Sequence, residues 1–162
     1  MRRWLIIVLL FTTIRCWSQT PHQIDSTINQ RLIHHGVADF TRKLIISQAR
    51  VESGVYTNNL TVKICQVHKD AYTNLFGMLN PRQRKTTSRG PCARAESRGG
   101  YACYGSIDKS VDDLILWLGA RELIRPYKTT AEYVTALRQN GYFSSSVEQY
   151  IRAIQYQNKL QK

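Results

Sequence analysis

An amphipathic segment from Val37 to about Glu52 constrains the fold more than any other feature, because it carries an acid on its apolar side. At about 100° per residue, Glu52 falls between the directions of Leu44 and Ile45. The apolar residues recur with a helical period before a stop at Gly54: Val37, Phe40, Leu44, Ile45 and Val51. We therefore expect an α-helix with a carboxyl group on the face that packs against the interior.

A carboxyl group in this setting has a use in catalysis. Burial disfavours the charged form of Glu52 and raises its pKa, and the negative end of the helix dipole acts in the same direction. A glutamic acid that stays protonated near neutral pH can protonate a leaving oxygen, as cleavage of a glycosidic bond requires. Periodicity alone leaves another interpretation open, in which Glu52 pairs with an arginine such as Arg50 or lies at the solvent edge of the helix.

The middle of the chain has a different pattern. Residues 58–76 have the pattern of short helical pieces, broken near Lys69 and ended by Gly77. Residues 79–104 contain two prolines and several glycines and show no helical period. They predict an irregular β-hairpin lobe.

Helical periodicity returns in the last third of the chain, where three helices are expected. Their predicted N-terminal caps are Asp108, Thr129 with Glu132, and Ser145 with Glu148. The predicted fold class is therefore mainly α (α+β), with several helices around one core and one small β-hairpin lobe.

The first residues have the pattern of an export signal. Two arginines precede an apolar run over residues 4–11, which is too short for a stable membrane helix. Cleavage after Ser18 satisfies the small-residue rule in part. Acylation of Cys16 is an alternative, although the bulky Arg15 precedes it. We expect an exported protein, periplasmic or extracellular.

The expected organisation is a signal peptide (1–18), a lead-in segment (19–36) and one catalytic domain (37–158). Of the 23 basic and 11 acidic residues, the signal peptide holds three basic ones, so the mature chain has a net charge of +9. Such a charge favours polyanions: cell-wall polymers, anionic lipid or nucleic acid. Export argues against nucleic acid, and no later segment is apolar enough for a stable membrane span.

Loss of Cys16 with the signal peptide leaves Cys65, Cys92 and Cys103. Cys92 and Cys103 bracket a glycine-rich stretch and form the favoured disulfide pair, with Cys65 a buried thiol. A zinc site or a nucleophile at Cys65 and His68 is disfavoured, because no second ligand pair, orienting group or oxyanion site accompanies them.

Four segments, taken in order, resemble one enzyme family. Residues 47–54 read SQARVESG, residues 74–78 read NLFGM, residues 101–106 read YACYGS, and residues 133–142 contain YV and end in NGY. This set resembles the family 73 glucosaminidases, which include bacterial autolysins and the flagellar rod-associated hydrolase domain. The resemblance covers roughly residues 37–156.

The resemblance implies a lysozyme-like fold in which the helix bearing Glu52 and the β lobe form the two walls of a glycan groove. It implies that Tyr142 lies close to the scissile bond, although a tyrosine after a glycine cap can equally belong to the core edge. Four more side chains are implied to contact the sugar: Asn74, Phe76, Tyr101 and Tyr104. The alternatives are core packing for Phe76 and the interior of the lobe for the two tyrosines.

The second acid departs from the family pattern. Many members carry an acid followed by an aromatic residue in the β lobe, whereas here Glu96 is the only acid between Leu79 and Tyr104, and Ser97 follows it. We carry Glu96 over as the second catalytic group, with the N-acetyl group of the substrate as the alternative nucleophile. The basic stretch 81–85 is interpreted as a rim that attracts anionic wall, or as a solvated loop.

The predicted function is hydrolysis of the β-1,4 bond after N-acetylglucosamine in peptidoglycan, with Glu52 as general acid and Tyr142 positioning the substrate. No metal or organic cofactor is expected, and the expected partner is the peptidoglycan glycan strand. The alternatives are muramidase or lytic transglycosylase specificity, a non-catalytic wall-binding module, and a basic protein acting on anionic membranes.

Overall fold

The computed structural model describes residues 19–57, 74–79, 91–93, 101–102 and 104–161. This part of the chain is mainly helical, which confirms the predicted fold class. The elements are α1 (Pro21–His34), α2 (Asp39–Glu52), β1 (Pro91–Ala93), β2 (Tyr101–Ala102), α3 (Ile107–Gly119), α4 (Thr130–Gln139) and α5 (Val147–Lys159).

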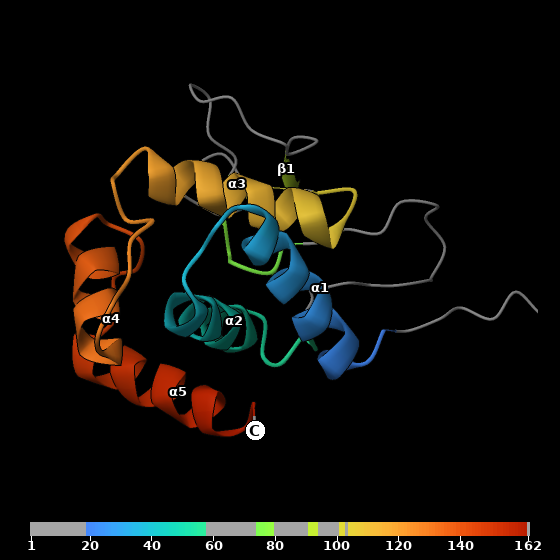
Figure 1. The fold of residues 1–162 in the computed structure, drawn as a ribbon. Coiled ribbons are helices and arrows are strands. Elements are labelled where there is room, and N and C mark those ends of the chain that lie inside the picture. Colours follow the sequence, from blue (N-terminus) through green and yellow to red (C-terminus); the bar gives the residue numbers. More distant parts are fainter. Residues whose placement is uncertain (1–18, 58–73, 80–90, 94–100, 103, 162) are drawn as a thin grey trace, which may run out of the picture.

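Helix α2 is the central element (Figure 1). It packs against α1 on one side and against α5 on the other, while α3 packs on α1 and α4 on α5. The two-stranded sheet lies beyond α3, away from α5 (Figure 1). The end of α2 that carries Glu52 is therefore within reach of side chains from several elements.

Helix α1 lies within the segment 19–36, for which the sequence pattern predicts only a lead-in to the domain. Thr20 accepts a hydrogen bond from the backbone N–H of Gln23, whose side chain bonds back to the backbone of Thr20, and Pro21 follows the cap. The buried face of α1 consists of Ile24, Ile28 and Leu32. Residues 21–34 are thus part of the packed core.

Helix α2 follows the predicted pattern with one exception. Leu44 and Ile45 are 0% and 1% exposed, and Glu52 is half-buried on the same side. Phe40, which was expected on the buried face, is 36% exposed. It lies in the first turn of α2.

Two of the three predicted N-caps are displaced. Thr129 caps α4 as predicted. Ser106 rather than Asp108 caps α3, and Ser146 rather than Ser145 caps α5. Each of these serines has an extended backbone and accepts from the backbone N–H three residues later, as a cap requires, and Asp108 instead lies in the first helical turn.

The β lobe is a short antiparallel hairpin, as predicted. Pro91 pairs with Ala102 and Ala93 with Tyr101, with an irregularity between the two pairs. Tyr101 also forms a bridge with Leu79, so β2 contacts chain on both of its edges. The turn after Asn74 is thereby joined to the lobe.

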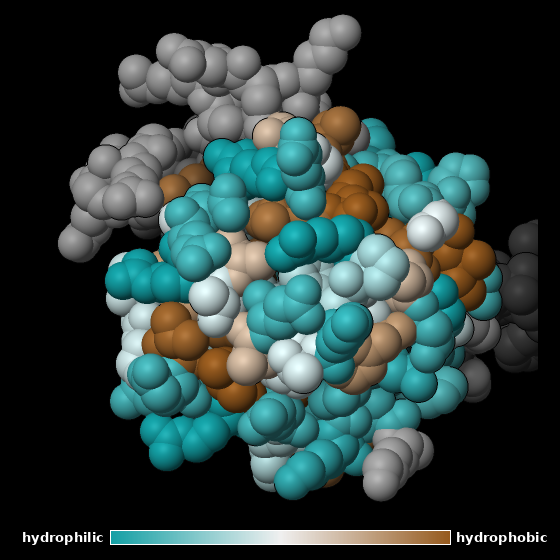
Figure 2. All heavy atoms as spheres, turned by 60° about the vertical axis from the view of Figure 1, so that its left-hand side comes forward, coloured by the Kyte–Doolittle hydropathy of each residue, from teal (hydrophilic) through white to brown (hydrophobic). Residues whose placement is uncertain are grey.

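Several expectations fall outside the described residues. They concern the signal peptide, the helical pieces over 58–73, the basic stretch 81–85, Glu96, and the thiols of Cys65 and Cys103. Within the described ranges, none of the helices has the length and apolar character needed to cross a bilayer. Figure 2 shows one face of the molecule, on which hydrophilic side chains predominate and hydrophobic ones form small separate patches.

Candidate active site

Glu52 is the last residue of α2, and its carboxyl group is half-buried. The hydroxyl of Tyr150, on α5, donates a hydrogen bond of 2.5 Å to Oε1 of Glu52. Burial raises the pKa of Glu52 above its ordinary value of 4.5, and the hydrogen bond from Tyr150 offsets part of that rise. The site thus combines a carboxyl group of raised pKa with partial access to solvent.

Arg50 does not neutralise this carboxyl group. Its guanidinium forms an ion pair with Asp25 of α1, and the hydroxyl of Tyr56 donates to Oδ1 of the same aspartate at 2.6 Å. The interpretation in which Arg50 pairs with Glu52 is therefore wrong. Asp25 instead joins α1 to Arg50 in the last turn of α2 and to Tyr56 just after that helix.

The chain leaves α2 through a turn with an unusual backbone. Gly54, Val55 and Tyr56 have φ values of 56°, 55° and 66°. This left-handed region is costly for a β-branched residue such as Val55. The backbone N–H of Tyr56 donates to Oγ of Ser53 at 3.0 Å, and its side chain is held by Asp25. These contacts support the strained turn directly after Glu52.

Asn74 joins the turn before Leu79 to the β lobe. Its Nδ2 donates to the carbonyl oxygens of Met78 (2.8 Å) and Ala102 (3.0 Å), and its Oδ1 accepts from the N–H of Met78 (2.9 Å). The residue is 1% exposed. Both amide donors are used by the backbone, so the expectation that Asn74 bonds an N-acetyl group is wrong, and its role is to hold the turn.

The turn places backbone against the acid. Gly77 has φ +60°, and a Cβ built on it would lie 3.3 Å from Oε2 of Glu52. A side chain there would crowd the carboxyl group, so glycine serves both the backbone angle and the close approach. The preceding Phe76 is 1% exposed. Its ring lies in the core, as the alternative interpretation holds, and offers no face for a sugar.

Tyr142 contacts the same turn. Its hydroxyl donates to the carbonyl oxygen of Phe76 at 2.5 Å, and its ring packs edge-on against Trp117, with centroids 5.2 Å apart. Burial of the phenol raises the pKa of Tyr142 well above its usual 10, and the charge of Glu52 adds to the rise. Tyr142 is half-buried and interacts electrostatically with Glu52, so the structure brings these two predicted site residues together.

Two further polar residues complete the inner side of the site. Gln48 lies one turn before Glu52 on α2 and is 0% exposed. Its Oε1 accepts a hydrogen bond from the hydroxyl of Tyr133 on α4. Among the described residues its Nε2 has no hydrogen-bond partner. The spacing of four residues from Glu52 is the sequence signal that would have pointed to Gln48.

The tyrosines of the β lobe have different surroundings. Tyr104 is 0% exposed, and its hydroxyl donates to the buried carboxylate of Asp113 on α3. A fully buried ring cannot bind a sugar, so the expectation for Tyr104 is wrong and its place in the interior is established. Tyr101, in β2, is half-buried. Glu96 lies outside the described residues, so the second acid is not located.

Comparison of the chain with protein-family models, with curated proteins and with solved structures found no match. The site must therefore be judged by its own geometry. That geometry is a carboxyl group of raised pKa near a glycine backbone and three phenols, from Tyr133, Tyr142 and Tyr150, whose pKa values burial also raises. In the described part of the chain no cluster of three or more His, Cys, Asp or Glu side chains suits a metal ion.

Proposed function

We propose that this chain is an exported peptidoglycan hydrolase that cleaves the glycan strand by general acid catalysis, with Glu52 as the acid. The cleaved bond is the β-1,4 bond after N-acetylglucosamine, as the resemblance to the family 73 glucosaminidases implies. A net charge of +9 after loss of residues 1–18 would draw the protein to an anionic wall.

One observation carries the proposal: the 74–78 turn and Tyr142, from two distant segments of the resemblance, both lie at the carboxyl group of Glu52, and the 101–106 segment is joined to that turn. The 74–78 turn lies against Glu52 through Gly77. Asn74 ties that turn to the β lobe through the carbonyl of Ala102, and Tyr142 ties it to the chain after α4. Motifs matched by chance would have no reason to meet around a half-buried acid.

The chemistry needs two states of this acid. Glu52 first donates its proton to the glycosidic oxygen as the bond from that oxygen to the anomeric carbon breaks. The resulting carboxylate then accepts a proton from the water that attacks the anomeric carbon, which restores the acid. Partial burial favours the protonated starting state, and partial exposure gives the proton a route to substrate.

The proposal is tested by comparing wild type with Glu52→Gln on purified peptidoglycan sacculi. The amide can still accept a hydrogen bond from Tyr150 but has no acidic proton, so loss of turbidity should slow by at least about 100-fold. Glu122→Gln is the matched control, because Glu122 is exposed after α3. It should cleave at the wild-type rate.

Mass spectra of the released fragments then define the bond. New reducing ends on N-acetylglucosamine support the glucosaminidase specificity, whereas reducing muramyl ends or 1,6-anhydromuramyl ends would replace it with muramidase or transglycosylase specificity. If wild type and Glu52→Gln both bind the wall and neither cleaves it, the chain is a non-catalytic wall-binding module. Leakage of anionic vesicles at equal rates with both proteins, without wall cleavage, would favour action on membranes.

A further inference from the structure

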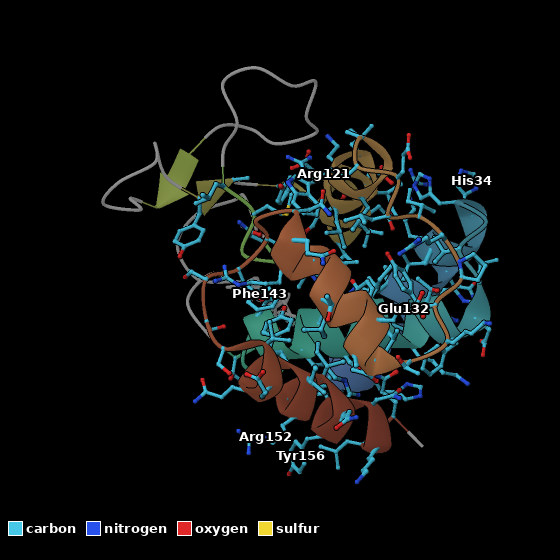
Figure 3. All side chains as sticks on the ribbon, turned by 90° about the vertical axis from the view of Figure 1, so that its left-hand side faces the viewer. His34, Arg121, Glu132, Phe143, Arg152 and Tyr156 are labelled. Atoms are coloured by element: carbon cyan, nitrogen blue, oxygen red, sulfur yellow. The ribbon has the colours of Figure 1, made fainter. Side chains whose placement is uncertain are left out.

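Tyr150 is held rigidly beside the acid by a residue that follows α4. Its ring is 7% exposed and stacks on Phe143, with centroids 4.2 Å apart and ring planes 13° from parallel. Figure 3 shows Phe143 on the inner side of the junction between α4 and α5. Stacking and burial fix the ring, and the ring fixes the direction of its hydroxyl group.

The hydroxyl of Tyr150 can act only as a neutral donor. Burial raises its pKa well above the usual 10, and the charge of ionised Glu52 raises it further. It donates to Oε1 of Glu52 at 2.5 Å. In a protonated carboxyl group the carbonyl oxygen is the stronger acceptor, so a hydrogen bond accepted by Oε1 favours the form with the acidic proton on Oε2.

We propose that Tyr150 is a positioning residue: its hydroxyl donates a hydrogen bond to Oε1 of Glu52 and thereby keeps the transferable proton on Oε2. Oε2 is the oxygen that lies against Gly77. The inference rests on the proposed function, since it assigns the oxygen from which Glu52 would act as an acid. It links α5, the last helix of the chain, to the chemistry at the end of α2.

The other titratable groups that surround Glu52 in the described part of the chain act on it differently. The phenols of Tyr133 on α4 and of Tyr142 after it interact with Glu52 electrostatically, and burial keeps both neutral. On α2, the nearby Arg50 is engaged by Asp25 of α1. Among these groups, the hydroxyl of Tyr150 is the one that stabilises the ionised form of Glu52 and lowers its pKa.

The test is Tyr150→Phe, which keeps the ring and its stacking but removes the hydroxyl. Burial then acts on Glu52 unopposed, so its pKa should rise above the wild-type value, as measured by NMR titration of the carboxyl carbon. The rate of sacculus cleavage should fall on the order of tenfold. Cleavage requires protonated Glu52, so the alkaline limb of the rate profile should move to higher pH.

Tyr156→Phe is the matched control on the same helix. Tyr156 is 61% exposed and projects away from the bundle (Figure 3). Its replacement should change neither the titration of Glu52 nor the rate. A second variant, with 3-fluorotyrosine at position 150, provides a stronger donor and should move the pKa of Glu52 downward. It also tests the inference if Tyr150→Phe fails to fold.

The results separate the two proposals. An unchanged Glu52 titration in both Tyr150 variants, or a slower rate with no shift of the pH profile, would overturn the role of Tyr150 and leave Glu52 as the acid. If wild-type protein does not cleave sacculi, the proposed function and the positioning role that rests on it both fail. A titration shift measured on that inactive protein would then show only that Tyr150 and Glu52 are coupled.

Discussion

Gly77 approaches Glu52 so closely that a methyl group on its Cα would lie 3.3 Å from the carboxyl oxygen Oε2. The two residues are separated by 25 positions in sequence and meet because α2 ends where the 74–78 turn reverses direction. A glycine backbone can therefore form one wall of the acid site.

Replacing Gly77 by alanine should impair both stability and cleavage. The φ of +60° costs a non-glycine residue about 1 kcal/mol of unfolding free energy, and the new methyl group would push on Oε2. Gly141→Ala is the control, because it has a φ of +73° but nothing within 4 Å of the added Cβ. In denaturant unfolding both variants should be destabilised. Only Gly77→Ala should cleave sacculi slowly, and equal rates would contradict the contact.

Glu52→Gln should make the protein more stable than wild type at alkaline pH. The folded-state pKa of Glu52 is raised above its ordinary 4.5. Wild type therefore loses stability as pH rises from about the unfolded value through the folded one, while glutamine has no charge to bury. Tm measured over a pH series should give a small difference below pH ~4 and an increasing advantage of the variant above it. A variant that is less stable than wild type at every pH would show that burial does not disfavour the ionised form of Glu52.

Asp25→Ala should strongly destabilise the fold. The side chains of Asp25 and Arg50 are 14% and 11% exposed, and Tyr56 donates to the same carboxylate. Removing one member of a largely buried ion pair leaves the other charge uncompensated. The free energy of unfolding should therefore fall by about 3 kcal/mol. Asp39→Ala is the control, since that side chain is 64% exposed in its ion pairs and should matter little. Similar urea midpoints for the two variants would argue against the role of Asp25.

Tyr104→Phe should reduce stability without reducing cleavage by the folded protein. The lost hydroxyl donates to buried Asp113, so we expect about 1–2 kcal/mol less unfolding free energy. KM for soluble glycan fragments should not change, because the ring is not exposed. An increase in KM at unchanged stability would restore the role in substrate binding that the resemblance implied.

Local patterns were sufficient where the outcome depended on one stretch of chain. The 3.6-residue period of α2 predicts both the helix and the side on which Glu52 lies, because an amphipathic stripe follows from backbone geometry. Helix α1 was missed, although Ile24, Ile28 and Leu32 are spaced by four and Thr20 with Gln23 forms a capping box. Frequent polar residues between those positions obscured the stripe.

The sequence by itself determined that α2 would form and would carry an acid on its buried side. Only the tertiary structure decided which groups surround that acid: the hydroxyl of Tyr150, the backbone of Gly77 and the phenol of Tyr142. It also decided that the amide of Asn74 serves the backbone and that Tyr104 is core. The physical reason is that helical periodicity is set by neighbouring residues, whereas the partners of a side chain are set by how distant elements pack.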